Sequence, residues 1–266
     1  ALNKFIRCRL SFYFENLLRV PMARSATMGY GSAIHYALEM YFKAMEVDPE
    51  RKSPDPDTLT THFIKGMKIY RSHFTQMEFD NFNILGEKIL REYYDEYKDQ
   101  WNTAKQTISE KNIKHTSIGE IPIKGKIDKV EIYDDHVKVI DYKTGTYKKD
   151  KLAGVSDEDQ GGDYWRQLVF YKLLVDNDPT LDWKMKSGTM DFVEKAKTKV
   201  KYDKIELPIS SQDEEAVTKQ LQESWTAIHN YEFEQFCEDE NCRWCNFVRD
   251  TSMVQPLELD ESYNEE

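Results

Sequence analysis

The sequence predicts an α/β fold built around one mixed β-sheet, with a helical annex on its N-terminal side. Apolar residues recur at helical spacing through the first hundred residues, residues 113–141 have the composition of strands, and the rest alternates between helix and strand patterns. A chain of 266 residues with 39% hydrophobic and 13% aromatic content can bury a sizeable core. We therefore expect one domain over residues 1–250, made of an annex (1–110) and a sheet-containing core (111–250), followed by an acidic tail (251–266).

Four helices are predicted in the annex. The first covers residues 2–18 and ends before Pro21, which cannot continue a helix. The second covers 29–46, and a loop rich in proline and aspartate follows it. Apolar residues on one side then predict helices over 59–74 and 82–101.

The core is predicted to contain both strands and helices. Strands over 113–141 end in the segment "DYKTG", and a lysine-rich polar loop follows. The later predicted elements are a helix over 164–175, strands over 187–195 and 200–208, a helix over 210–231 opened by a capping box from Ser211 to Glu214, and a compact segment that carries cysteines.

Charge and composition exclude several classes of protein. The formal net charge is -11, whereas proteins that coat nucleic acids are usually basic, although an enzyme with a local basic track remains compatible with this charge. The sequence has no apolar run of about 18 residues and no signal peptide, so no membrane association is expected. Four cysteines in a chain of this length do not suggest a secreted disulfide scaffold, and we expect a cytoplasmic protein. Because the sequence starts with alanine and at once shows a helical pattern, we expect a fragment of a longer protein.

Two carboxylates stand out in the hairpin "GKIDKVEIYDDHVKVIDYKTG", residues 125–145. If a tight turn is centred on Asp134 and Asp135, the register places Asp128 directly opposite Asp141, with their Cβ atoms ~4.5–5.5 Å apart. Lys143 then shares the face of Asp141, because side chains alternate along a strand. A three-residue turn would instead place the two carboxylates on opposite faces.

Facing carboxylates on an apolar sheet are costly unless a cation lies between them or one of them is protonated. Oxygen ligands with room for water suit Mg²⁺ or Mn²⁺, and a neighbouring ammonium group can orient water or stabilise charge on a phosphate. This is the chemistry of phosphodiester hydrolysis. The alternative is that these residues lie on the protein surface without a function, because Asp-x-Lys is a common sequence in solvated hairpins.

Four spaced motifs carry a resemblance to a known family. They are "GYGSAIHYALE" around His35, "GKIDKVE", "VIDYKTG" and "RQLVFYKLL". In this order they resemble the PD-(D/E)xK nuclease superfamily in its RecB-like branch, and "GGDYWRQLVFYKLL" is similar to the C-terminal nuclease domain of UvrD/AddA-type helicases. The resemblance implies a restriction-endonuclease-like core, Mg²⁺ or Mn²⁺ as cofactor, DNA as substrate and a helicase in the same polypeptide or complex.

The resemblance also implies metal ligands. These would be the side chains of His35, Asp128 and Asp141, together with the backbone carbonyl of Tyr142. A single histidine on an amphipathic helix is otherwise more often a packing residue. Glu120, upstream on an expected strand, has a supporting role under the resemblance.

The other implied catalytic residues follow the metal ligands in the chain. Lys143 would position the attacking water, beside the catalytic carboxylates Asp128 and Asp141. Gln167 and Tyr171 lie at positions i and i+4 of one helix face, which the resemblance places beside the site. Without the resemblance they would be ordinary helix-surface residues.

The four cysteines form a separate pattern, with one near the start of the sequence and three near its end. Some RecB-like nucleases hold a [4Fe–4S] cluster with such a set, which here is Cys8, Cys237, Cys242 and Cys245. The late spacing C-x₄-C-x₂-C departs from the usual one. An iron–sulfur cluster, zinc and free packed thiols therefore all remain open.

Basic and aromatic residues after Lys143 suggest a path for DNA. Lys148, Lys149 and Lys151 lie in the loop, Arg166 opens the next helix, and "KAKTKVK" carries Lys195, Lys197, Lys199 and Lys201. Lysines would contact phosphates without reading sequence, although lysines on edge strands also protect sheets from aggregation. Tyr147, Tyr164 and Trp165 would stack bases of a single strand.

The sequence thus predicts a metal-dependent DNA nuclease domain of a helicase–nuclease used in DNA repair or recombination. The alternative is a catalytically degenerate nuclease fold that only binds DNA or a partner. The intact pair of aspartates with its lysine favours the first.

Overall fold

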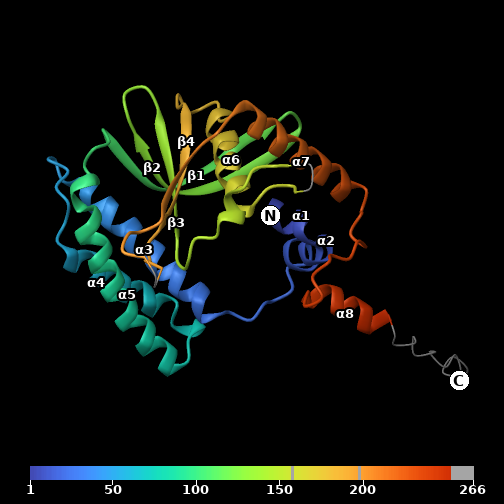
Figure 1. Cartoon of the computed structure of the whole chain (residues 1–266), viewed down its shortest axis with the longest axis horizontal. Coiled ribbons are helices and arrows are strands. Elements are labelled where there is room, and N and C mark those ends of the chain that lie inside the picture. The colour runs from blue at the N-terminus through green and yellow to red at the C-terminus, as the bar shows by residue number, and fades with distance from the viewer. Residues whose placement is uncertain (157–158, 197–198, 253–266) are drawn as a thin grey trace, which may run out of the picture. The chain divides into compact units, whose positions relative to one another are not determined.

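The computed structural model describes residues 1–252 except 157–158 and 197–198 (Figure 1). Residues 253–266, most of the expected acidic tail, lie outside the described part. The chain forms two compact units: unit 1 comprises residues 1–22 and 221 onward, and unit 2 comprises residues 23–220.

Unit 2 contains a five-stranded sheet of order β1-β2-β3-β4-β5. Its strands are β1 (Gln106–Ile118), β2 (Ile121–Ile132), β3 (Val137–Lys143), β4 (Met185–Phe192) and β5 (Lys204–Pro208). Only β3 and β4 pair in parallel, and the other neighbours are antiparallel. The helix α6 (Asp163–Asp176) lies in the connection between β3 and β4, because parallel strands need a long crossover. The expected α/β fold with a mixed sheet and N-terminal helices is confirmed.

A layer of three helices packs against one side of the sheet (Figure 1). The helices are α3 (Ala26–Val47), α4 (Pro56–Ile69) and α5 (Gln76–Tyr97), each close to a predicted helix. Their buried side chains form one core together with Ile140 and Tyr142 of β3. Since side chains alternate along a strand, Asp141 points to the opposite face, where α6 lies.

Two boundaries differ from the sequence prediction for local reasons. The structure starts β1 at Gln106 rather than at Ile113, because Gln106 pairs with Ile132 and the antiparallel ladder runs the length of β2. The capping box of α7 (Ser211–His229) uses Ser210 and Asp213, whose side chains exchange hydrogen bonds with each other's backbone amides, and not Ser211 and Glu214.

Unit 1 contains short helices at both ends of the chain. The predicted helix over residues 2–18 is divided into α1 (Leu2–Arg7), α2 (Arg9–Phe12) and a π-helical turn (Tyr13–Leu17). The division falls at Cys8, whose backbone is extended and whose sulfur accepts a hydrogen bond from the amide of Ser11. The C-terminal part ends in α8 (Arg243–Ser252).

No helix within the described residues is both long and apolar enough to cross a membrane.

Candidate active site

The β2–β3 hairpin has the register expected from the sequence. Lys129 pairs with Ile140, Ile132 pairs with Val137, and the backbone amide of Tyr133 donates to the carbonyl of His136 across the turn. Continued by one residue, this register brings Asp128 opposite Asp141. The carboxylate of Asp128 accepts a hydrogen bond of 3.0 Å from the amide of Tyr142, which fixes it against β3.

Asp141 is the centre of a hydrogen-bonded network on the α6 side of the sheet. One of its oxygens accepts hydrogen bonds from Gln167 Nε2 (2.7 Å) and from the hydroxyl of Tyr171 (2.8 Å). Its other oxygen lies 2.6 Å from Lys143 Nζ, and Lys143 also donates to Gln167 Oε1 at 2.9 Å. Gln167 therefore contacts both Asp141 and Lys143, and it also donates to the hydroxyl of Tyr171, which lies one turn later on the same helix face.

His35 reaches the site from helix α3. Its Nδ1 lies 3.3 Å from Asp128 Oδ2, and its ring meets the ring of Tyr142 edge to face. A Cβ at Gly31, one turn earlier on α3, would lie 3.3 Å from Thr144 Oγ1. The absence of a side chain at Gly31 thus lets α3 come close to the end of β3.

Glu110 is a site residue that the sequence analysis missed. One carboxylate oxygen each from Glu110 and Asp128 and one ring nitrogen of His35 lie within 4.8 Å of one another. Glu110 also forms an ion pair with Lys126. Its backbone has φ = 56°, a left-handed conformation that costs a non-glycine residue of order 1 kcal/mol.

The expectation for Glu120 is not supported, because Glu120 is exposed in the turn between β1 and β2. The acid that accompanies His35 and Asp128 is instead Glu110, which lies on β1, ten residues before Glu120. The sequence offered one signal that could have identified Glu110: a tight hairpin of β1 and β2 places it almost opposite Asp128. That inference requires the position of the turn at Gly119, whose φ of 58° favours glycine.

The site shifts the pKa values of its charged groups in different directions. Burial raises the pKa of Asp141, and the charge of Asp128 adds to this effect, while Lys143 opposes it only in part. Burial also acts to raise the pKa of Asp128, but the hydrogen bond and charge of His35, the Tyr142 amide and Lys143 outweigh it, so this pKa is lowered. Burial acts to lower the pKa of His35, and its contacts with Asp128 reverse the direction, so this pKa is raised.

These residues fit a hard divalent cation. Three carboxylates, from Glu110, Asp128 and Asp141, lie at the site, where Lys126 pairs with Glu110 and Lys143 pairs with Asp141. Oxygen donors with one imidazole nitrogen suit Mg²⁺ or Mn²⁺. Asp141 is not within the compact group of His35, Glu110 and Asp128, because its oxygens are turned to α6 and Lys143.

The residues expected to contact DNA fall into two groups. Lys148 and Lys149 are exposed in the loop after β3. Arg166 is only 3% exposed, and its guanidinium donates to Gln220 Oε1 and to the carbonyls of Gln160 and Gly161. The structure thus does not place Arg166 where DNA could contact it, because it anchors the preceding loop.

The three aromatic residues expected to stack on bases also differ in their exposure. Trp165 is 2% exposed and its indole N–H donates to Asp213, so it is not available to a base. Tyr147 and Tyr164 are half-buried, and the ammonium groups of Lys143 and Lys151 lie 5.0 and 4.8 Å from the ring centre of Tyr164. Lys197 of the second basic segment lies outside the described residues.

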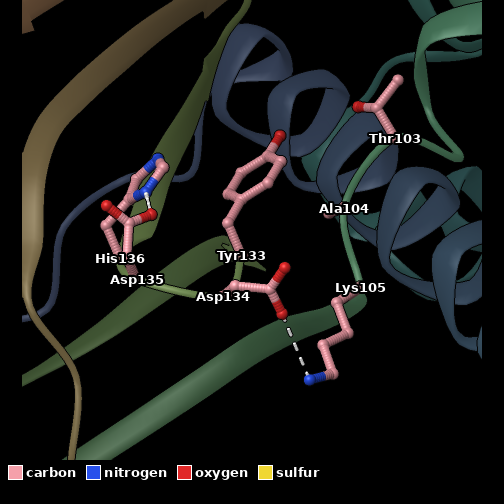
Figure 2. Close-up of a pocket in the computed structure, with 7 residues that line it drawn as sticks. All are labelled: Thr103, Ala104, Lys105, Tyr133, Asp134, Asp135 and His136. Atoms are coloured by element: carbon pink, nitrogen blue, oxygen red, sulfur yellow. Dashed lines mark hydrogen bonds and ion pairs between the residues drawn. The ribbon is translucent and has the colours of Figure 1, made fainter.

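A surface hollow at the turn of the β2–β3 hairpin is separate from this site (Figure 2). His136 Nδ1 lies 2.6 Å from Asp135 Oδ1 and its ring stacks on Tyr133, while Lys105 pairs with Asp134 at 3.3 Å. The hollow is about five residues, or ~16 Å, from the paired aspartates along the strands. Tyr133 and Thr103 of the hollow also form hydrogen bonds, to Glu131 and to the carbonyl of Gln100.

The four cysteines are gathered in unit 1. Their sulfur atoms all lie within 4.8 Å of one another, and each is a free thiol. Cys8, Cys242 and Cys245 are buried, and Cys237 is half-buried.

The structure is thus an α/β protein with a mixed sheet, in which acids from β1, β2 and β3 lie near a histidine of α3 and a lysine at the end of β3. A family model described as the PD-(D/E)XK nuclease superfamily matches residues 1–249. The chain belongs to the PD-(D/E)XK nuclease superfamily.

One solved structure has a similar fold. A candidate exonuclease from Eubacterium rectale shares 13% sequence identity over 97% of this chain and 87% of its own, with a TM-score of 0.53. Protein SSO0001 (14% identity, TM-score 0.34, 91% of this chain and 93% of that one) and protein VC1899 from Vibrio cholerae (10% identity, TM-score 0.24, 86% and 56%) are too different in shape to carry an argument. A comparison with curated proteins finds no match.

Proposed function

We propose that this chain is a deoxyribonuclease that hydrolyses phosphodiester bonds with the help of Mg²⁺ or Mn²⁺. The observation that carries the proposal is the continuous network of Lys143, Gln167, Asp141 and Tyr171. Such a network holds an ammonium group in one orientation beside a carboxylate, which a protein that only binds DNA does not need. The arrangement therefore favours catalysis over the degenerate alternative.

The ligands of the metal would be His35, Glu110, Asp128 and Asp141, with the carbonyl of Tyr142 as a further donor. A bound divalent cation supplies positive charge to the phosphate and lowers the pKa of water. His35 would bind through a neutral ring nitrogen, so a metal would compete with the proton, and Asp128 favours the proton by raising the pKa of His35.

Lys143 orients the attacking water and stabilises negative charge that develops on the phosphate. Gln167 keeps Lys143 in place by accepting from its ammonium group, and at the same time it donates to Asp141. Tyr171 donates its hydroxyl proton to Asp141 in a hydrogen bond and does not ionise, since burial and the charge of Asp141 raise its pKa well above the usual value. Both residues of α6 are thus positioning residues.

Lys148 and Lys149 would contact DNA phosphates on the way to this site, and Tyr147 and Tyr164 would offer ring faces to unpaired bases. We further propose that the chain is the nuclease module of a helicase–nuclease in DNA repair or recombination. This part rests on the similarity of its "GGDYWRQLVFYKLL" segment to the nuclease domains of UvrD/AddA-type helicases.

The decisive experiment is incubation of the purified chain with end-labelled single- and double-stranded DNA in Mg²⁺, in Mn²⁺ and in EDTA. We expect cleavage with either metal and none with EDTA. Asp141→Asn and Lys143→Ala should abolish cleavage, while Lys88→Ala, an exposed change on α5, should leave it intact. Tight DNA binding without cleavage in both metals, or unchanged cleavage by both site variants, would refute the proposal.

A further inference from the structure

We propose that the four cysteines of unit 1 hold a single zinc ion and not a [4Fe–4S] cluster. The cluster is what the resemblance implies for one early and three late cysteines. The distances between the cysteine sulfurs distinguish the two, because the ligand sulfurs of a zinc ion lie closer together than those of a [4Fe–4S] cluster. The inference is independent of the nuclease proposal.

The sulfur separations are short. Cys8 Sγ lies 3.7 Å from Cys242 Sγ and 3.6 Å from Cys245 Sγ, and Cys237 Sγ lies 3.6 Å from Cys245 Sγ. The remaining pairs are within 4.8 Å. None of the four cysteines forms a disulfide, although their sulfur atoms are neighbours.

These separations match ligands that share one ion. Four thiolates at ~2.3 Å from a zinc ion, at the corners of a tetrahedron, lie ~3.8 Å apart. In a [4Fe–4S] cluster each cysteine binds a different iron, so the ligand sulfurs surround a core of eight atoms and must be farther apart. With the side chains in their present conformations, the observed spacing leaves no room for that core.

The surroundings of the sulfurs also suit thiolates. The amide of Ser11 donates to Cys8 Sγ at 3.3 Å, and the Ser11 hydroxyl lies 3.6 Å from Cys242 Sγ. Leu10 and Trp244 pack around the four cysteines, and Phe14 stacks on Trp244 with ring centres 4.4 Å apart. Such partners stabilise negative charge on sulfur and limit access of water to the ion.

The ion would join segments that are far apart in sequence. Cys8 lies where the first predicted helix is interrupted, and Cys242 and Cys245 flank the start of α8. The chain between Cys8 and Cys237 includes all of residues 23–220, so an ion bound here closes that chain into a loop. Closing so long a loop reduces the entropy of the unfolded chain and stabilises unit 1.

The test is metal analysis of the whole chain, purified without oxygen from cells grown with both iron and zinc, after a wash with EDTA to empty the carboxylate site. We expect about one zinc ion per chain, no acid-labile sulfide and no visible absorption. Iron in place of zinc, with or without sulfide, would overturn the proposal, and so would a chain that contains no metal.

A second arm uses variants and a spectroscopic readout. Cys242→Ser should lower the zinc content by at least tenfold, while Arg243→Lys, an exposed neighbour without sulfur, should retain it. If Cys242→Ser does not fold, refolding of the unaltered chain with Co²⁺ gives an independent readout. The visible bands and sulfur-to-cobalt charge transfer of a tetrahedral four-thiolate site are then expected, and an octahedral spectrum would contradict the inference.

Discussion

Lys143 is held at two points, by the carboxylate of Asp141 and by the amide oxygen of Gln167. A lysine side chain has about 2 kcal/mol of rotamer entropy, so a free ammonium group would spend much of its time away from the reacting phosphate. Gln167 removes this freedom because its own amide nitrogen is bonded to Asp141 and to Tyr171. At the residue scale, the orientation of Lys143 depends on a residue that need not touch DNA.

Gln167→Ala should therefore slow cleavage without weakening DNA binding. We expect kcat to fall about tenfold or more, which corresponds to ~1.4 kcal/mol, because the ammonium group of Lys143 loses its second anchor. Single-turnover cleavage and fluorescence anisotropy would measure the two effects separately. A change in Kd with an unaltered cleavage rate would mean that Gln167 binds DNA directly.

A second residue-scale prediction concerns the buried pair of Lys129 and Glu131, whose charged atoms are 2.7 Å apart. Lys129 is 2% exposed and its ammonium group lies 3.9 Å from the ring centre of Phe42. Glu131→Gln leaves that ammonium without its counter-ion, so we expect a loss of ~3 kcal/mol in the free energy of unfolding by urea. Lys129→Met combined with Glu131→Gln should lose clearly less than the sum of the two single changes.

The pair of Lys129 and Glu131 should also make the free energy of unfolding depend on pH. Burial acts to raise the pKa of Glu131, but the charge and hydrogen bond of Lys129 outweigh it, so its folded-state pKa is lowered. A carboxyl of this kind stabilises the fold above its unfolded pKa of ~4.3, and the contribution is lost as the pH falls through the folded pKa. The advantage of wild type over Glu131→Gln in urea should hence shrink on acidification below about pH 4. An equal difference at pH 3 and pH 7 would exclude this origin.

At the scale of elements, the three-helix layer depends on close approach at two glycines. A Cβ at Gly66 of α4 would lie 3.0 Å from the Cα of Ala33 on α3, and a Cβ at Gly86 of α5 would lie 2.1 Å from the ring of Phe63. Phe63 is fully buried, and a close-packed interior leaves its ring little space to move into. Glycine inside a helix weakens it by up to ~1 kcal/mol relative to alanine, so packing outweighs helix propensity at these positions.

Gly86→Ala should for this reason destabilise the protein although alanine is the better helix former. We expect a net loss of ~1–3 kcal/mol in the free energy of unfolding, because overpacking at Phe63 exceeds the gain in propensity. Thermal or urea unfolding measures the effect. Gly86→Ala with Phe63→Leu should recover part of the loss, and a stabilised single variant would show that α4 and α5 can separate without cost.

At the scale of the whole molecule, a net charge of -11 opposes the approach of DNA. The exposed Lys148 and Lys149 lie on the loop that leaves the active site, while acidic residues dominate the rest of the chain. We therefore expect weak binding that decreases steeply with salt. Binding strength in a longer protein would depend on additional basic surface.

Lys148→Ala combined with Lys149→Ala should weaken the binding of single-stranded DNA at low salt. Each lost phosphate contact reduces the slope of log K against log salt concentration by ~0.7. Fluorescence anisotropy on an Asp141→Asn background prevents cleavage during the titration. Lys65→Ala combined with Lys68→Ala, two exposed changes on α4, is the matched control, because it also removes two positive charges. An equal effect of the two double variants would mean that the loop lysines act only through net charge.

Much of the fold and the site could be predicted because the signals are local. The hairpin register follows from one tight turn, so Asp128, Asp141 and Lys143 were placed from about twenty consecutive residues. Helix α6 follows from helical spacing, which also puts Gln167 and Tyr171 on one face. The burial of Arg166 was not predictable in this way, because its partner Gln220 comes from a distant segment and its other acceptors depend on how the loop folds.

The sequence by itself thus determined the α/β class, the helical layer, and the hairpin with its acid and lysine set, since turn geometry and periodicity act over short distances. Only the tertiary structure decided that Glu110 and not Glu120 joins His35 and Asp128, that Arg166 and Trp165 are buried, and that four cysteines meet within 4.8 Å. These outcomes depend on contacts between residues far apart in the chain. Their energies come from burial and hydrogen bonding in the folded state and leave no local pattern in the sequence.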